Sequence, residues 1–514
     1  MEKLKKGLKN LIKRRDFCFC LFFIILNIIF SKQVLEDAEI DCVGVVLIAE
    51  ILLEALIILV IYSKYTKDLR PEKKFLILAV ILGVIFLMLL PPGQSPDDKN
   101  HFRRAYGIAS GVFLPTVIND EGYGGSELPA EIEEVFEATP HHGAYSKTVH
   151  KARVGVSGEN TFQPYPNTAI YNFICYLPQA SAAFIGKTFN MPILVTAYLM
   201  RIFNFAVFAI LIYFAIKLMP KFKGIMLFVA LNPITLQEAT SLSLDGLAIG
   251  LGMFLVAFVC YLSYTKKTEI NKKELGILYL LTILIGFCKM VYSPLILLFS
   301  LIPYKRFGTK KRKYLHAILM AIIFIIINVV WLKLVANLLG GFNFNPNAEI
   351  DTQAQMAVIL KDPIGHVLRM VTTTSYYMDF YLKGMLGVSL GAFTFGLPDT
   401  YFFIALGFIT ILFAQRQETF NIRNRDKAVY LGVFIMVLAL IFTSEYLQWT
   451  NVGAPIIEGV QGRYFLPILP IVAILICRRT KKSPGMEIIT ESKVLAFSMF
   501  INVMAFVAFF ANNI

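Results

Sequence analysis

Long apolar runs separated by short polar segments dominate the pattern of this chain. The first three runs occupy about residues 17–35, 43–63 and 75–91. A membrane whose hydrocarbon core is about 30 Å thick requires about 20 apolar residues in each crossing helix. The pattern therefore predicts an all-α polytopic membrane protein and excludes a single soluble domain.

Ten further apolar runs bring the expected number of membrane-spanning helices to about 13. The runs at 275–288 and 290–303 are short for a full crossing, so this number carries a margin of two. Another run, 168–186, is interpreted as an interfacial or re-entrant helix, because as a crossing it would put every later basic loop outside the cell. The ten runs lie at about residues 192–217, 224–240, 243–263, 275–288, 290–303, 314–339, 396–414, 429–449, 463–477 and 494–512.

The charged residues predict how this bundle is oriented. Lys and Arg exceed Asp and Glu by 14, yet the excess lies in alternate short loops, as the positive-inside bias of membrane proteins predicts. Seven basic residues stand among the first fifteen, which predicts a cytoplasmic amino terminus. The lipid bilayer is the expected partner of this chain, which is 57% hydrophobic, and nucleic acid is not.

Two long polar stretches interrupt the apolar runs. Residues 92–166 hold ten acidic and six basic residues, a length and acidity that suit an extracytoplasmic loop. The second stretch, 340–395, contains an amphipathic portion at 364–386 that we expect on the membrane surface. The predicted segments are a three-span amino-terminal segment (1–91), an extracytoplasmic loop with the interfacial helix (92–191), central spans (192–339), a second extracytoplasmic segment (340–395) and carboxy-terminal spans (396–514).

A cluster of ionisable residues follows the third span directly. Residues 96–101 read Pro-Asp-Asp-Lys-Asn-His, and Asp97 and His101 share one face of a helix that begins near Pro96. A carboxylate at this place can accept the proton of an acceptor hydroxyl as a general base. We therefore interpret Asp97, Asp98 and His101 as catalytic candidates. The alternative is that the two acids only cap a helix.

Three basic side chains stand on the expected external side, against the charge bias. Arg201 lies in the external half of a span, and Lys289 and Arg463 lie at external turns. A lipid-linked phosphate would give all three a ligand, since Arg binds phosphate through two N–H groups. The alternatives are a structural pair of Arg201 with Glu238 or Asp245, and extension of Lys289 and Arg463 towards lipid headgroups.

Polar residues at the same external ends of the spans are candidates for contacts with substrate. Asp245, in the turn 241–246, either caps the next helix or binds sugar hydroxyls. Gln461 and Tyr464 lie beside Arg463 in the motif Gly-Val-Gln-Gly-Arg-Tyr and offer polar and tight-turn partners. The seven cysteines have no metal-like spacing. No cofactor is assigned, although the paired acids at 97–98 are candidate ligands of a divalent cation such as Mg²⁺ or Mn²⁺.

Together these motifs resemble a bacterial family of multi-pass membrane proteins of unassigned function. The family hallmark Pro-Asp-Glu-x-x-His corresponds to residues 96–101, where Asp98 replaces the usual Glu. Its Gly-x-Gln-Gly-Arg-Tyr-Phe-x-Pro corresponds to 459–467, and its lysine-bearing turn to Lys289 with Tyr292. The resemblance covers about residues 95–470. This family is in turn similar to the C-type glycosyltransferases, which include the protein mannosyltransferases and the aminoarabinose transferase.

The resemblance implies a C-type glycosyltransferase bundle whose large first extracytoplasmic loop follows the third span. It also implies a polyprenyl-phosphate sugar donor, a cell-surface glycan acceptor and catalysis on the outer face of a bacterial cytoplasmic membrane. The implied roles are catalysis for Asp97, Asp98 and His101, donor phosphate binding for Arg201, Lys289 and Arg463, and substrate binding for Asp245, Tyr292, Gln461 and Tyr464.

Two other classes of function stay open. A flippase for lipid-linked sugars would need charged residues at membrane depth, and Glu50, Glu54 and Arg201 meet that description. The two glutamates are four residues apart on one helix face, where they either relay protons or are satisfied by neighbouring helices. A polymerase or ligase of surface polysaccharide would use a diphosphate-linked glycan and external arginines.

Overall fold

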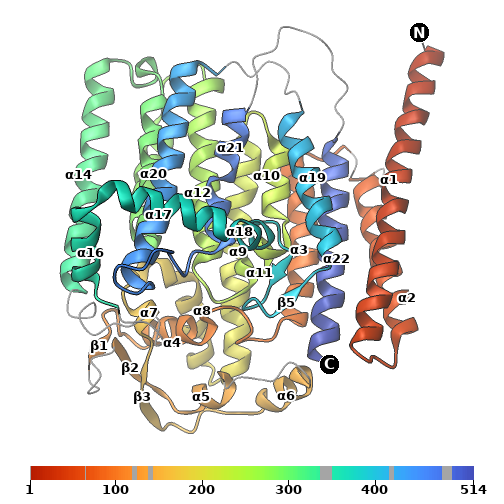
Figure 1. Ribbon diagram of the computed structural model, residues 1–514, viewed down its shortest axis with the longest axis horizontal. Helices are drawn as coiled ribbons and strands as arrows, with labels where there is room; N and C mark the ends of the chain where they lie inside the picture. The colour runs from red at the N-terminus through yellow and green to blue at the C-terminus, as the bar shows by residue number, and fades with distance from the viewer. Residues whose placement is uncertain are drawn as a thin grey trace.

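The computed structural model describes residues 2–63, 65–66, 68–117, 124–136, 143–335, 350–415, 422–476 and 489–514. Within these ranges the protein is a bundle of long helices with two small sheets (Figure 1). The α-helices are α1 (Glu2–Asp37), α2 (Val43–Tyr62), α3 (Pro71–Leu89), α4 (Asp98–Ala109), α5 (Glu131–Phe136), α6 (Ala144–Lys151), α7 (Pro166–Ala169), α8 (Leu177–Thr188), α9 (Ile193–Leu218), α10 (Lys223–Ala230), α11 (Pro233–Thr240), α12 (Asp245–Cys260), α13 (Lys272–Cys288), α14 (Lys310–Leu334), α16 (Thr352–Lys361), α17 (Pro363–Tyr376), α18 (Met378–Met385), α19 (Asp399–Ala414), α20 (Asn424–Gln448), α21 (Leu469–Ile476) and α22 (Glu491–Asn513). Tighter or wider helical turns form η1 (Phe173–Tyr176), η2 (Tyr261–Thr265), η3 (Met290–Leu301), η4 (Tyr304–Phe307) and η5 (Gly462–Ile468), and the strands are β1 (Thr116–Val117), β2 (Gly124–Pro129), β3 (Asn160–Pro164), β4 (Ser389–Leu390) and β5 (Phe395–Gly396).

Seven of the described helices are long and apolar enough to cross a membrane, which confirms a multi-pass helical protein. The predicted number of about 13 crossings stays a prediction. The seven segments are Arg15–Asp37, Val43–Tyr62, Ile193–Leu218, Asp245–Thr265, Lys310–Leu334, Asn424–Gln448 and Glu491–Asn513. Shorter apolar helices lie at Met290–Leu301, Asp399–Ala414 and Gly462–Ile476.

Helices α12 and α22 form the enclosed part of the bundle. Of the 18-residue apolar stretch in each of these helices, 89% is buried in α12 and its continuation and 94% in α22. The corresponding share is 6% for α14, which stands at the edge of the molecule (Figure 1). Small residues permit the enclosure, since a Cβ on Gly252 of α12 would lie only 2.8 Å from Pro467. The broad apolar surface of α14 is therefore the one suited to lipid.

The two ends of the chain lie at opposite ends of the bundle (Figure 1). The carboxyl-terminal end of the bundle also carries α4 to α8 and a three-stranded antiparallel sheet in which β2 pairs with β1 and β3. We call this end of the bundle the α4–α8 end. The all-α prediction missed these strands because β1 has two residues and β3 five, too few for a clear alternating pattern.

The predicted span 224–240 is divided into α10 and α11 at Asn232. Pro233 occupies the first turn of α11, and the Asn232 side chain accepts a hydrogen bond from the Ile234 amide at 3.2 Å. The same side chain donates Nδ2 to the Met385 carbonyl at 3.2 Å. The break therefore ties the bundle to the predicted second extracytoplasmic segment.

The Glu50 and Glu54 carboxyl groups of α2 face α1. Ser31 Oγ donates to Glu50 at 2.9 Å, and Asn27 Nδ2 donates to Glu54 at 2.6 Å. Polar contacts of this kind hold helices together where no water competes. One oxygen of each carboxyl group is thus held by α1, while the buried Oε2 atoms of Glu50 and Glu54 have no hydrogen-bond partner among the described residues, so the proton relay stays open.

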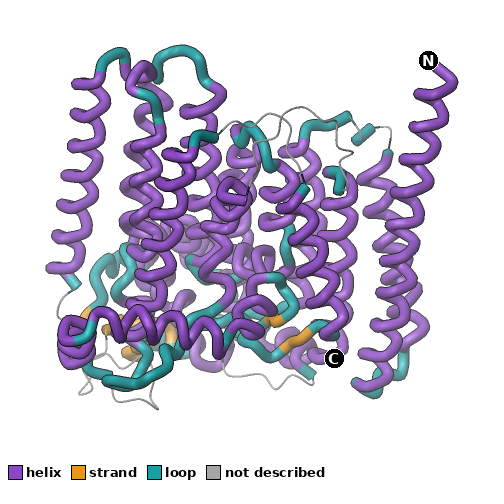
Figure 2. Tube along the Cα trace, turned by 45° about the horizontal axis from the view of Figure 1, so that its top comes forward, coloured by secondary structure: helices purple, strands orange, loops and turns teal. Residues whose placement is uncertain are grey.

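The amphipathic portion predicted at 364–386 consists of α17 and α18, with the break at Tyr377. Helix α17 runs across the long helices of the bundle (Figures 1 and 2). It buries His366 and leaves Ile364 and Leu368 exposed. Its predicted place on the membrane surface stays a prediction, and residues 340–349 of that segment lie outside the described ranges.

Candidate functional site

Asp97 stands at the junction between α3 and α4 and is open to solvent. Its backbone adopts a left-handed conformation, with φ of 59°, and this turn lets α4 begin at Asp98. Asn167 Nδ2 donates to its Oδ1 at 2.7 Å. The protein around this exposed side chain removes part of its hydration, and this desolvation raises the pKa of Asp97, while the nearby Arg463 cation lowers it. Asp97 therefore has an accessible carboxylate with enhanced basicity.

Asp98 is buried, with both carboxylate oxygens in use. Its Oδ2 accepts from the Gly93 amide and its Oδ1 from the Leu242 amide, each at 3.0 Å. Burial raises the pKa of Asp98, while the Arg201 charge and these two amides lower it. Asp98 joins the loop after α3 to the loop before α12, so the two adjacent acids do different things.

His101 is buried one turn into α4. Its Nδ1 shares a hydrogen bond with the Tyr176 hydroxyl over 2.7 Å. Burial lowers the pKa of His101 to about 3, so the imidazole is neutral at physiological pH. His101 can position or polarise a neighbour, and it carries no charge while doing so.

Asp245 binds both of the predicted external cations. At the first turn of α12, its Oδ1 accepts from Lys289 and its Oδ2 accepts from Arg463 Nε at 2.9 Å. Arg463 Nη1 lies 3.6 Å from Glu238 Oε1. The chain thus brings four charged groups from α11, α12, the α13–η3 junction and η5 to one place. The charges of Lys289, Arg463 and Asp245 all act on Asp97.

Tyr464 and Tyr292 line this charged group. Lys289 Nζ lies 4.9 Å and the Arg463 guanidinium 5.5 Å from the centre of the Tyr464 ring, distances at which cation–π attraction acts. The Tyr292 hydroxyl donates to the Tyr464 carbonyl at 3.0 Å. The two tyrosines hold the cation-bearing turns against each other.

Arg201 lies apart from these cations and is fully buried. It donates Nη1 to the Leu90 carbonyl at 2.8 Å and Nε to the Thr240 carbonyl. The acid whose charge acts on it is Asp98, rather than the Glu238 or Asp245 considered for a structural pair. The guanidinium joins the end of α3 to the end of α11, while its buried Nη2 has no hydrogen-bond partner among the described residues.

The glycines of the Gly-Val-Gln-Gly-Arg-Tyr motif explain its spacing. A Cβ on Gly462 would lie 2.5 Å from the Met385 amide and clash with the Tyr381 carbonyl, so only glycine lets η5 pack on α18. Gly459 has φ of +86°, and a Cβ there would lie 2.6 Å from Glu445 Oε2 and 2.7 Å from Trp449. Both glycines are therefore needed to present the Arg463 side chain.

Two acids of this site were not among the predicted site residues. Glu238 lies beside Arg463, and Glu445 of α20 lies beside Gly459 and close enough to Lys289 for their charges to interact. Glu238 was considered only as a partner of Arg201. Glu445 stands alone near the end of the apolar run 429–449, and an ionisable residue within such a run is the signal that could have identified it.

The carboxylates do not fit a divalent cation site. Both Asp98 oxygens are held by backbone amides, so Asp97 and Asp98 do not form a pair of ligands. Across the described ranges, no three His, Cys, Asp or Glu side chains converge as metal ligands do. Ligation of Mg²⁺ or Mn²⁺ by Asp97 and Asp98, which the sequence left open, therefore has no support among the described residues.

Fold and site together define a multi-pass helical membrane protein with a charged site at the α4–α8 end. The chain belongs to the family described as "Predicted membrane protein (DUF2142)", which matches residues 80–472. This match confirms the resemblance to a multi-pass membrane family and spans every predicted site residue from Asp97 to Tyr464. No curated protein and no solved structure matches the chain.

Proposed function

We propose that this protein is a C-type glycosyltransferase that moves a sugar from a polyprenyl-phosphate donor to a cell-surface glycan. The observation that carries the proposal is the accessible Asp97 carboxylate next to two cations that Asp245 holds. An acid open to solvent and a cation pair at the end of a membrane bundle suit a reaction between a water-borne acceptor and a lipid-borne phosphate.

The proposed reaction is a direct displacement. The oxygen of an acceptor hydroxyl attacks the anomeric carbon of the donor sugar, and its proton passes to Asp97. The bond from the anomeric carbon to the phosphate oxygen breaks, and the polyprenyl phosphate leaves with the electron pair. Lys289 and Arg463 stabilise the charge that develops on the leaving phosphate. One displacement inverts the anomeric carbon.

The remaining residues hold this arrangement in place. Asp245 orients the Lys289 and Arg463 side chains, and N–H groups that these two bonds leave over would bind the phosphate. Asp98 and Arg201 fix the backbone around Asp97, and we assign them positioning roles.

The proposed setting is the outer face of a bacterial cytoplasmic membrane. The basic amino-terminal segment would be cytoplasmic and about 13 helices would cross the bilayer. The α4–α8 end, which carries Asp97, lies opposite the amino terminus and would therefore face outward (Figure 1).

A sealed-vesicle assay separates the proposed transfer from a flippase. Purified protein is reconstituted with a polyprenyl-phosphate hexose labelled in the sugar, and both label release from the lipid and movement between leaflets are followed. We expect the label to leave the lipid and enter acceptor glycan, with polyprenyl phosphate as the second product. Movement of intact labelled lipid between leaflets, with no cleavage, would overturn the proposal in favour of the flippase.

A further inference from the structure

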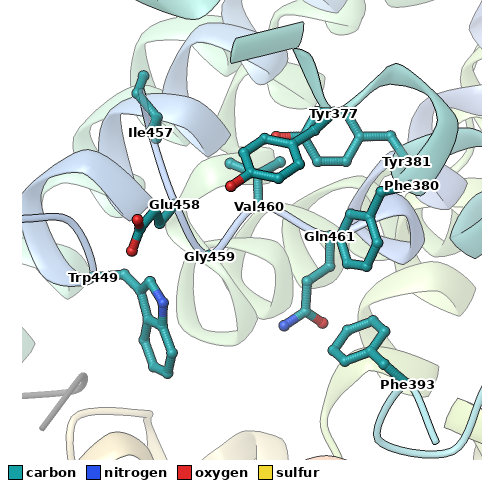
Figure 3. A pocket seen from close by; sticks show the side chains of 10 residues that line it. All are labelled: Tyr377, Phe380, Tyr381, Phe393, Trp449, Ile457, Glu458, Gly459, Val460 and Gln461. Carbon is teal, nitrogen blue, oxygen red and sulfur yellow. The ribbon is translucent and has the colours of Figure 1, made fainter. Parts of the chain in front are cut away.

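A pocket of about 300 Å³ lies beside the charged site and shares its loop. Its wall is rich in aromatic side chains from α18, the α17–α18 junction and the end of α20, and the 457–461 loop closes it (Figure 3). The side chains that matter here are Tyr377, Phe380, Tyr381, Trp449, Glu458 and Gln461. Asp97, Lys289 and Arg463 are not in the wall, so the pocket is separate from the reaction centre.

The Gln461 side chain carries an unpaired hydrogen-bond acceptor in the pocket wall. Its Oε1 is buried and has no partner in the part of the chain that the structure describes. In Figure 3 its amide extends from the loop into the space between Trp449 and Phe393. A buried polar atom without a partner lowers stability, so a ligand that donates a hydroxyl to it gains affinity.

The chemistry of the wall matches a sugar ring. The C–H faces of a pyranose are apolar and pack on flat aromatic rings such as those of Tyr381 and Trp449. Its hydroxyls donate to an amide oxygen and to a carboxylate, which Gln461 and the exposed Glu458 provide. A lipid tail would pack on the rings and leave both polar groups unpaired.

The pocket is joined rigidly to the reaction centre. Gln461 stands two residues before Arg463, and the intervening Gly462 packs on the backbone of Tyr381 in the pocket wall. Gly459 contacts both Trp449 of the wall and Glu445 beside the cations. A ligand held in the pocket therefore has a fixed position relative to Lys289 and Arg463.

We propose that this pocket binds a sugar ring of the acceptor glycan and presents its neighbouring hydroxyl to the charged site. The role of the bound sugar as acceptor rests on the proposed glycosyl transfer. The binding of a sugar is argued from the pocket alone. A volume of about 300 Å³ lies at the lower limit of small-molecule sites, which suits a short part of a glycan.

Tryptophan fluorescence provides the test, because the chain has only two tryptophans. Trp449 lies in the pocket wall, whereas Trp331 belongs to α14 and donates to the Ile170 carbonyl at 2.8 Å. Trp331→Phe leaves Trp449 as the sole reporter in the full chain, reconstituted in nanodiscs of phosphatidylethanolamine and phosphatidylglycerol. The probes are the methyl glycosides of glucose, mannose and N-acetylglucosamine, and polyprenyl phosphate without sugar. A thermal transition measured for each variant establishes that it is folded.

We expect at least one methyl glycoside to shift the Trp449 emission in a saturable way. Adding Gln461→Leu, which keeps the size and removes the amide, should weaken that binding about fivefold to tenfold. A Trp449→Phe variant, in which Trp331 alone reports, should show no shift. The inference is overturned if no methyl glycoside gives a saturable shift, if polyprenyl phosphate alone gives it, or if Gln461→Leu binds as tightly as its parent.

This test is independent of the test of glycosyl transfer. Sugar binding in a protein that never cleaves the donor would refute the transferase and leave the sugar pocket standing. Glycosyl transfer without a Trp449 response would refute the pocket and leave the transferase standing. When both hold, Gln461→Leu should raise the KM for acceptor with little change in kcat, whereas Asp97→Asn should lower kcat.

Discussion

Arg463 donates its Nε proton to Asp245 over 2.9 Å, although the two residues are 218 positions apart in the chain. The same carboxylate also accepts from Lys289. One acid thus fixes the direction of two cations that a membrane protein would otherwise extend towards lipid headgroups. The proposed phosphate site depends on this single side chain.

Asp245→Asn should destabilise the protein strongly. An amide can accept from only one of the two cations, and removing one partner of a buried pair costs about 3–5 kcal/mol. Glu238, 3.6 Å from Arg463 Nη1, offsets part of that loss if Arg463 is the cation released, whereas Lys289 would lose its only carboxylate hydrogen bond among the described residues.

Asp379→Asn is the matched control, since Asp379 is 67% exposed in its pair with Lys383, and exposed pairs contribute about 0–1 kcal/mol. Thermal transitions measure both variants. Equal transition temperatures would contradict the importance of the Asp245 pairs.

The rate of transfer should depend on pH through Asp97. A general base works when deprotonated. The value of kcat/KM should therefore be at its maximum above the pKa of Asp97 and should fall as the pH drops below that pKa. Because desolvation raises the pKa of Asp97, the midpoint should lie above 3.8, the usual value for Asp. His101→Gln should leave this midpoint in place, since the pKa of His101 is about 3 and its imidazole is already neutral. If the midpoint moves in the His101→Gln variant, the titrating group is not Asp97 alone, and the assignment of the base would be contradicted.

Gly462→Ala should damage the site, whereas Gly407→Ala should not. A Cβ at 462 would lie 2.5 Å from the Met385 amide, and backbone on both sides leaves no room to adjust. Overpacking of this kind costs about 1–3 kcal/mol or more. Among the described residues, nothing lies within 4 Å of a Cβ on Gly407 in α19, so alanine should gain up to about 1 kcal/mol of helix propensity there. Thermal transitions of the two variants test the contrast, and similar losses in both would refute the packing explanation.

Glu54→Gln should leave sugar transfer within about twofold of wild type. The glutamine Oε1 can still accept from Asn27 Nδ2, so the contact between α1 and α2 persists. A proton relay would not survive the change, since an amide does not exchange a proton as a carboxyl group does. Loss of activity with an unchanged thermal transition would support the proton-relay interpretation and, with it, the flippase.

The sequence predicts the membrane helices better than the site. Apolar runs specify a helix because the bilayer leaves the backbone no other hydrogen-bond partners, and the motif residues Asp97, Lys289, Asp245 and Arg463 do come together. Arg201 shows the limit of this reasoning. A buried arginine has the same sequence signature whether its partner is a phosphate or two backbone carbonyls, and here it holds the carbonyls of Leu90 and Thr240.

The different environments of Asp97 and Asp98 could not be predicted from sequence either. They are adjacent and chemically identical, and the left-handed backbone of Asp97 turns one outward and the other inward. Tyr381, Trp449 and Gln461 line one pocket although they come from different elements. Tertiary packing brings them together, and no periodic sequence pattern indicates it. The short strands of the α4–α8 end were not predicted either. They pair over a long separation within the polar stretch 92–166, and local sequence does not indicate such pairing.

The central claim is that Asp97 is the base, and the most direct test compares two isosteric variants of the adjacent acids. Asp97→Asn should lower sugar transfer from the polyprenyl-phosphate donor by about 10²–10⁴-fold. Its thermal transition at neutral pH should equal or exceed that of the wild type, because the raised pKa means that the charged form costs stability there. Asp98→Asn should instead lower the thermal transition, since an amide nitrogen would face one of the two backbone N–H donors. Wild-type rates of transfer in a folded Asp97→Asn variant would contradict the claim.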